Sequence, residues 1–231
     1  AYFWLDDMPN ANKTYETRLR LARESGNIIQ QCECLGNLGR VSLTDDSEEA
    51  VLEAIGLFEE QLNLAEQVND KKEIGKAQGN LGRAYLRSDN RLYDSVELFA
   101  QQLAQMQEIR DEREQSMALE NIGLARKKLG DIEKRFEDFH IDISAESKHQ
   151  YYLAVEAFEQ ALTIVRRVQD RKGEASICWN LGLAYLALGQ FENASNYMRI
   201  QIDFEQSIGH PHAEMHYEYL DKLLRYQASV R

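Results

Sequence analysis

The stretch "GNLGRAYLRSDN", Gly79–Asn90, decides the fold, because it places two glycines inside what otherwise reads as a strong helix former. Each interior glycine costs a helix about 1 kcal/mol relative to alanine. A helix that keeps a glycine therefore needs the absence of a side chain there, so that a neighbouring element can pack closely. The pattern recurs, since Asn-[Leu or Ile]-Gly stands at 37–39, 80–82, 121–123 and 180–182. The chain is a repeat array.

Each copy of this motif lies at a fixed distance from a helix start and from a second apolar pattern. Upstream of each motif glycine stands a polar residue that can accept hydrogen bonds from the first free amides of a helix: Asn27, Asp70, Asp111 and Asp170. Downstream, a small residue, an apolar residue and Leu or Ile follow at intervals of four, which places all three on one helical face. Each unit is a helical hairpin of about forty residues, and a period of this length indicates a solenoid.

The composition agrees with a helical array and excludes several classes of protein. The chain has 231 residues, 43% of them hydrophobic, and only two prolines. No apolar run is long enough to cross a membrane. A net charge of −12 argues against a nucleic-acid-binding surface as the main function. Three cysteines do not form a disulfide framework and fit a reducing compartment such as the cytoplasm.

The repeats predict the domain organisation. The opening "AYFWLDDMPNA" aligns without a gap on Ala184–Ala194. Residue 1 then falls inside a helix, which predicts a longer parent protein. We expect a single array over 1–231, with an incomplete repeat at 1–27, complete repeats at 28–70, 71–111, 112–170 and 171–210, and a capping helix at 211–226.

The repeated motifs resemble the tetratricopeptide repeat. The resemblance rests on Gly-x-Ala-Tyr at 82–85 and 182–185, followed by a small residue and Phe four positions later at Ala54/Phe58, Ser95/Phe99 and Ala154/Phe158. The unit is longer than the common form, its closing proline is missing, and Trp179 is displaced by one position. Longer units of this kind are similar to those of Pins-type spindle adaptors, kinesin light chains and the sensor arms of signalling ATPases. The resemblance implies an all-α fold, a right-handed superhelix of about five hairpins plus a capping helix.

The resemblance also implies a concave groove, lined by the first helix of each hairpin, that binds peptides. There a recurring asparagine bonds the backbone of the ligand, which here predicts a ladder of Asn37, Asn80, Asn121 and Asn180. Asparagine is an indifferent helix residue with both donor and acceptor groups, so four copies at one phase indicate a shared requirement. The alternative is a side-chain bond that helps neighbouring hairpins pack.

Charged and aromatic residues add candidates at the same helical phase. Arg40 and Arg83 follow the motif glycine, and with Lys76, Arg87, Lys127 and Lys128 they would make the groove basic, which favours an acidic partner. The alternative is a solvated charged face paired with Glu33 or Glu120. Trp179 is either an apolar anchor for a ligand or packs under a neighbouring segment.

Two further features carry structural expectations. The motif glycines, Gly39, Gly82, Gly123 and Gly182, should let each first helix press against its hairpin partner. An insertion near 131–152 separates the two helices of the third complete repeat. It forms either a partner-binding flap or extensions of both helices that pack against each other, and we favour the extensions.

Signals for catalysis are poor, so we expect no enzyme, no cofactor and no metal. Cys32 and Cys34 point in different directions on one helix, and zinc spacing is not met. His212 and His216 lie four apart, but no further ligands surround them. The sequence therefore predicts a non-catalytic protein- or peptide-binding scaffold, acting as an adaptor or as the sensing arm of a larger cytoplasmic signalling protein. The alternative is a structural module that self-associates into a homo-oligomer, and a weaker third reading is a small-molecule or metal sensor.

Overall fold

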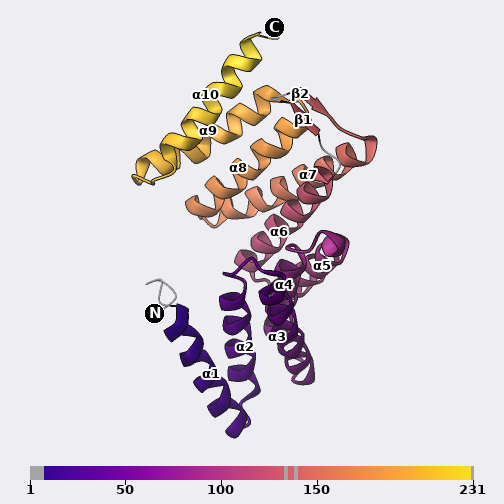
Figure 1. Cartoon of the computed structure of the whole chain (residues 1–231), viewed down its shortest axis with the longest axis vertical. Helices are drawn as coiled ribbons and strands as arrows, with labels where there is room; N and C mark the ends of the chain where they lie inside the picture. The colour runs from indigo at the N-terminus through magenta and orange to yellow at the C-terminus, as the bar shows by residue number, and fades with distance from the viewer. Residues whose placement is uncertain (1–7, 133–134, 138–139, 230–231) are drawn as a thin grey trace. The chain divides into compact units, whose positions relative to one another are not determined.

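The computed structural model describes residues 8–132, 135–137 and 140–229, and most of them lie in helices (Figure 1). The expected all-α solenoid is confirmed. The chain divides into two compact units, Ala1–Asp111 and Glu112–Arg231. The division falls at the predicted junction between the repeats 71–111 and 112–170. Residues 1–7, which the sequence places in an incomplete helix, lie outside the described residues.

The first unit contains one single helix and two helical hairpins. Each helix packs on the next one along the chain, and α2 also contacts α4. The hairpins are α2 with α3 and α4 with α5, as the repeat spacing predicts. The elements are α1 (Met8–Glu24), α2 (Ile28–Ser42), α3 (Glu48–Gln67), α4 (Lys71–Tyr85), the short 3-10 helix η2 (Asp89–Arg91) and α5 (Leu92–Glu108).

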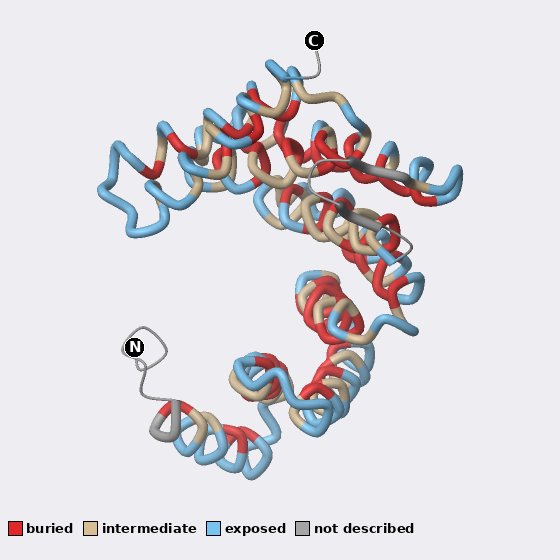
Figure 2. The backbone as a smooth tube through the Cα atoms, turned by 45° about the horizontal axis from the view of Figure 1, so that its top comes forward, coloured by how far each residue is buried: buried red, intermediate tan, exposed pale blue. Residues whose placement is uncertain are grey.

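The second unit repeats this arrangement and ends in a single helix. Neighbouring helices again pack in chain order, and α6 also contacts α8. Buried residues follow the sides on which helices face one another (Figure 2). The helices are α6 (Glu112–Asp131), α7 (Ala145–Arg167), α8 (Arg171–Ala187), α9 (Phe191–Ser207) and α10 (Ala213–Ser229).

Polar caps fix the helix starts as predicted. The Asn27 side chain accepts from the Gln30 amide at 3.1 Å and starts α2. The Asp70 carboxylate accepts from two amides at the start of α4, and Asp170 accepts from the Gly173 amide at 2.9 Å. Each of these bonds satisfies an amide that has no partner within its own helix. Short-range sequence therefore sets the register of the first helices.

The motif glycines bring the two helices of each hairpin together, as expected. A Cβ atom at Gly39 would lie 2.4 Å from the ring of Phe58, which is fully buried on α3. The same geometry recurs along the chain, so each glycine makes room for the side chain four positions after the small residue of the second helix. The other pairs are Gly82 with Phe99 at 2.7 Å, Gly123 with Phe158 at 2.5 Å and Gly182 with Met198 at 2.7 Å.

The insertion lengthens both helices of its hairpin. Helices α6 and α7 have 20 and 23 residues, against 15 and 17 in α4 and α5. The extensions pack on each other: a Cβ at Gly130 would lie 3.0 Å from the ring of Tyr151, whose hydroxyl donates to Asp131 at 2.5 Å. Both helices are thus extended and pack on each other, as expected for part of the insertion.

A two-stranded hairpin, which the sequence pattern did not predict, joins the extended helices. Strand β1 (Arg135–Glu137) pairs antiparallel with β2 (His140–Asp142), and Phe136 stands opposite Ile141 in the register. Phe136 is aromatic and Ile141 is β-branched, and residues of both types favour strands. Residues 133–134 and 138–139 of the insertion lie outside the described residues.

Candidate binding faces

The recurring asparagines lie on one face of the first helices, which we call the asparagine face. The contact between each motif glycine and its partner side chain fixes the rotation of the helix, so the residues two before and one after the glycine are placed alike in every hairpin. In the first unit the face carries Asn37 and Arg40 on α2 and Asn80 and Arg83 on α4; in the second it carries Asn121 and Leu124 on α6 and Asn180 and Leu183 on α8.

In the first unit each asparagine holds an arginine one turn further along. The Arg40 guanidinium donates to the side-chain oxygen Oδ1 of Asn37, and Arg83 donates to Oδ1 of Asn80 in the same way. Arg40 is exposed, and within the described part of the chain it makes no ion pair, with Glu33 or any other acid. Because the amide oxygen is a neutral acceptor, the positive charge of Arg40 remains available to a carboxylate.

Asn80 differs from Asn37 in its burial. It is 4% exposed, and its amide nitrogen donates to the side-chain oxygen of Gln61 on α3 at 2.9 Å. A Cβ at Gly36 on α2 would lie 3.0 Å from the same nitrogen. Asn80 therefore sits where α2, α3 and α4 meet, with both halves of its amide bonded inside the protein. At this position the asparagine makes the side-chain bond between neighbouring hairpins that the packing alternative describes, and it also accepts from Arg83.

Three of the predicted basic residues form ion pairs with carboxylates. The Lys76 ammonium lies 2.5 Å from Glu73, and Lys127 lies 2.8 Å from Asp131. Arg87 follows the end of α4, so it leaves the helix face and pairs with Asp46 at the hairpin tips. There it borders a cavity of about 440 Å³ lined by Asp46, Glu48, Val51, Leu52, Ile55, Arg87, Ser88, Asn90 and Arg91.

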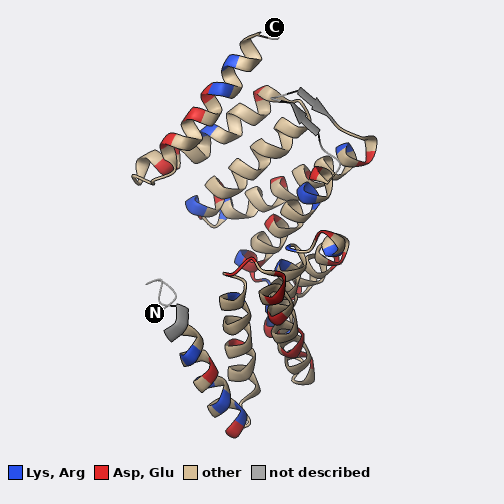
Figure 3. Ribbon diagram, in the orientation of Figure 1, with Lys and Arg blue, Asp and Glu red and all other residues tan. Residues whose placement is uncertain are grey.

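In the second unit the asparagine face carries no arginine at the repeat position after the motif glycine. Leu124 and Leu183 replace the arginines, and they are half-buried, as are Asn121 and Asn180. Helix α8 carries no charged residue beyond its first turn (Figure 3). Between α6 and α8, Ser176 donates to Glu120 at 2.9 Å, and burial raises the pKa of Glu120 above its usual range. The two units thus offer different chemistry at the same repeat positions.

Trp179 packs under a neighbouring segment, which is the second of the two readings. Its ring centroid lies 4.2 Å from that of His216 and 5.9 Å from that of Tyr219, both on α10. The capping helix thereby covers part of the face that the sequence assigned to a ligand.

The comparisons with known proteins point to the hairpin that carries Trp179. Residues 175–203, which span most of α8 and α9, match the tetratricopeptide repeat family. The chain contains a tetratricopeptide repeat. The crystal structure of BtubC (BKLC) from P. vanneervenii is similar, with a TM-score of 0.61 and 15% identity over 96% of this chain and 92% of that chain. At this identity the similarity concerns the helical-repeat fold alone. No curated protein sequence matches the chain.

Some buried residues of the helical hairpins were not predicted from the sequence. Gln61 and Gln102 are buried opposite Gly36 and Gly79, and their recurrence at one repeat phase was the available signal. A second case is Glu205, which is 2% exposed and lies 2.7 Å from the His216 ring nitrogen. No local sequence pattern indicates a contact between residues eleven positions apart on two successive helices.

Other kinds of site find little support in the described residues. They contain no group of three or more histidines, cysteines and acids placed to hold a metal ion. None of their helices combines the length and apolar content needed to cross a membrane. All three cysteines are buried and unpaired, and burial together with Glu73 raises the pKa of Cys32 to about 11. A thiol of that kind is a poor nucleophile.

Proposed function

We propose that the chain is a non-catalytic scaffold that binds a protein or peptide along the asparagine face of its first helices. It acts as an adaptor or as the sensing arm of a larger cytoplasmic signalling protein. Tetratricopeptide repeats generally bind proteins or peptides, which supports the general class. Free, buried cysteines support a reducing compartment.

The observation that carries the proposal is the exposed guanidinium of Arg40, held by Asn37 without a carboxylate. Arg83 repeats this pairing on α4, which contacts α2, so two guanidinium groups occur in register on neighbouring helices. Arginine binds carboxylates through two parallel hydrogen bonds. A chain of net charge −12 would otherwise repel an acidic partner, and local cations restore attraction at one face. The preferred ligand is therefore an acidic peptide, whose carboxylate binds the exposed Arg40 guanidinium.

The test compares two double variants of equal charge. Arg40→Gln/Arg83→Gln removes the proposed site, whereas Arg20→Gln/Arg225→Gln removes two cations that pair with exposed acids elsewhere. The probes are a fluorescein-labelled glutamate-rich peptide and its glutamine counterpart, followed by fluorescence anisotropy. A hydrogen bond to a charged group contributes about 1.5–3 kcal/mol, so losing one contact should weaken binding about tenfold to a hundredfold.

We expect the wild type and the Arg20/Arg225 variant to prefer the glutamate peptide, and the Arg40/Arg83 variant to lose that preference. If both variants lost this preference equally, the preference would depend on net charge alone, and the proposal would be overturned. The alternative, self-association through this face, predicts a concentration-dependent dimer in size-exclusion chromatography with light scattering. That dimer would dissociate in the Arg40/Arg83 variant and would bind no acidic peptide.

A further inference from the structure

Helix α10 packs where Trp179 and Leu183 of α8 lie, so it covers part of the asparagine face of the second unit. We propose that α10 is a displaceable helix: it competes in cis with a partner helix that carries the same stripe of side chains. The inference rests on the proposed function in one respect, because it takes the asparagine face to be the binding face. It goes further by assigning the second unit a helical ligand, separate from the acidic peptide of the first unit.

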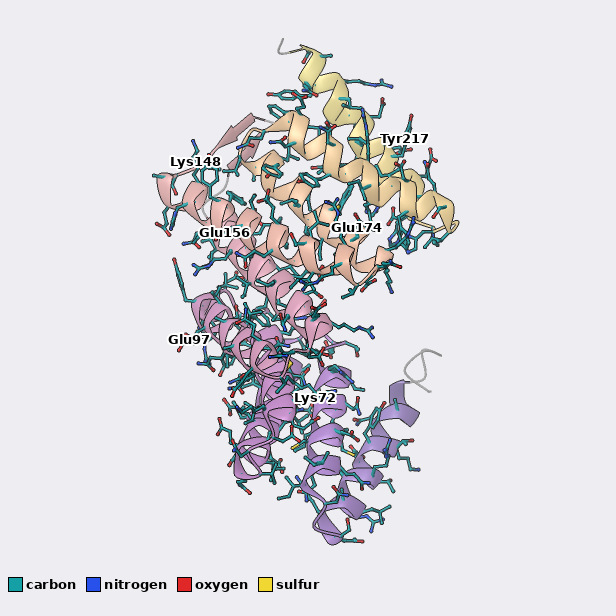
Figure 4. The ribbon with its side chains drawn as sticks, turned by 180° about the vertical axis from the view of Figure 1, so that it is seen from behind. Lys72, Glu97, Lys148, Glu156, Glu174 and Tyr217 are labelled. Atoms are coloured by element: carbon teal, nitrogen blue, oxygen red, sulfur yellow. The ribbon has the colours of Figure 1, made fainter. Side chains whose placement is uncertain are left out.

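The first step is that α10 is lightly packed. Of its 17 residues only Leu220 and Leu223 are buried, whereas α9, of equal length, buries five. Its remaining surface is exposed or half-buried (Figure 2). Met215 is 56% exposed and Tyr217 is 51% exposed, and Figure 4 shows Tyr217 at the outer edge of α10. Among the described residues, α10 is thus packed on one side only. Most of its other side chains already contact solvent, so their exposure would change little if the helix moved away.

The second step is that the contacts of α10 form a single stripe. His216 and Tyr219 lie on Trp179, while Leu220 and Leu223 pack in one apolar cluster with Leu186, Met198 and Ile202, against which Trp179 and Leu183 also lie. Positions 216, 219, 220 and 223 follow the i, i+3, i+4, i+7 spacing of one helical face. A groove that binds an amphipathic helix recognises this spacing, not a particular chain. A separate helix with the same stripe can therefore take the same place.

The third step is a polar anchor that sets the specificity. The Glu205 carboxylate is 2% exposed; it accepts from Gln201 on its own helix at 2.7 Å and lies 2.7 Å from His216 Nδ1. His210, in the turn before α10, lies 3.6 Å away. Removing His216 would take away a close partner of this buried carboxylate and leave Gln201 as its hydrogen-bond donor, and losing a partner of a buried charge is costly. A competing helix must consequently bring a donor such as histidine at the position of His216, in addition to its aromatic and leucine residues.

The experiment offers the stripe in trans. A fluorescein-labelled peptide with the sequence of residues 210–229 is titrated into the full chain, and binding is read from anisotropy. In the wild type, α10 competes at an effective concentration on the order of millimolar, so binding should be weak. In the chain with Leu220→Ala/Leu223→Ala the competitor is loosened, and we expect at least tenfold tighter binding. Adding Trp179→Ala to that chain should remove the gain, and a peptide with Leu220→Asp should not bind.

Circular dichroism establishes that each variant folds. Tyr219→Ala, which loses a contact with Trp179 but keeps both buried leucines, serves as a second loosened chain. A folded, loosened chain that binds the peptide no better than the wild type would overturn the proposal, as would a gain that survives Trp179→Ala. The chain has two tryptophans, so Trp4→Phe leaves Trp179 as the sole emitter. Its emission should shift to the red on loosening and return to the blue with peptide.

The acidic-peptide assay separates this inference from the proposed function. It reports on Arg40 and Arg83 in the first unit, which none of the α10 variants alters. Acidic binding with no exchange of α10 would overturn only the displaceable helix. Exchange of α10 without acidic binding would overturn only the acidic ligand of the first unit.

Discussion

Replacing Gly39 by alanine tests whether the motif glycines exist for packing. Gly39 lies inside α2, where alanine is the better helix former by about 1 kcal/mol. Local propensity alone therefore predicts that Gly39→Ala stabilises the protein. The packing argument predicts the opposite, because the added methyl group points at the buried ring of Phe58.

The magnitude follows from the contact distance. The new Cβ would lie 2.4 Å from the Phe58 ring, whereas ordinary contact begins at 3.4 Å. Relieving an overlap of this size means displacing a fully buried aromatic ring, and overpacking of a core costs about 1–3 kcal/mol. For so large an overlap we take a cost of about 3 kcal/mol, the upper end of this range. Subtracting the gain in helix propensity of about 1 kcal/mol leaves an expected net loss of about 2 kcal/mol.

The control is a glycine without a neighbour. Gly56 lies within α3, is exposed, and has no heavy atom within 4 Å of the place that a Cβ would take, so Gly56→Ala should stabilise the chain by about 0.5–1 kcal/mol. Urea unfolding followed by circular dichroism measures both free energies at comparable slopes. A double variant, Gly39→Ala/Phe58→Leu, should lose less than the sum of its single changes. If Gly39→Ala proves as stable as Gly56→Ala, the packing explanation is wrong.

Three other predictions address single side chains. Asn80→Ala should destabilise the chain by about 1–3 kcal/mol in urea unfolding because it strands the buried Gln61, whereas Asn37→Ala should cost less than about 0.5 kcal/mol. Cys32 should not react with Ellman's reagent at pH 8 until urea unfolds the chain, since its pKa is raised to about 11; rapid reaction in the native state would contradict its burial. For Glu120, the raised folded-state pKa means that the folded chain binds its proton more tightly than the unfolded chain does. That contribution is fully present below about pH 4 and is lost as the pH rises through the folded pKa, so Glu120→Gln should flatten this part of the stability profile measured by thermal unfolding.

Features that depend on neighbours in sequence were predictable. The spacing between a polar cap and a motif glycine sets where each first helix starts, and the caps at Asn27, Asp70 and Asp170 occupy their expected places. The glycine-to-aromatic contacts were predictable as well, because both partners recur at a constant phase and a repeat must place them alike. The extension of α6 and α7 followed from the length of the insertion, whereas Phe136 and Ile141 lie in the two strands that were not predicted.

Features that depend on contacts between hairpins were not predictable. Asn37 and Asn80 look equivalent in sequence, yet only Asn80 is buried, because Gly36 and Gln61 make a place for its amide. The ion pairs of Lys76 and Lys127 are different, because their acids lie on the same helix at the i, i+3 and i, i+4 spacing and could have been predicted. A phase on a helix states which side a residue occupies and does not state what the adjacent helix brings to it.

One variable position shows how this array acquires different chemistry along its length. The residue three before each motif glycine faces the junction with neighbouring helices. Gly36 leaves room for the side-chain amides of Gln61 and Asn80. Glu120 accepts a hydrogen bond from Ser176, and Trp179 packs against aromatic rings of α10. The recurring residues form the solenoid whichever residue occupies this variable position. Recognition should therefore be sought in the positions that change between repeats, such as the arginines at 40 and 83 against the leucines at 124 and 183, and not in the asparagines that all four repeats share.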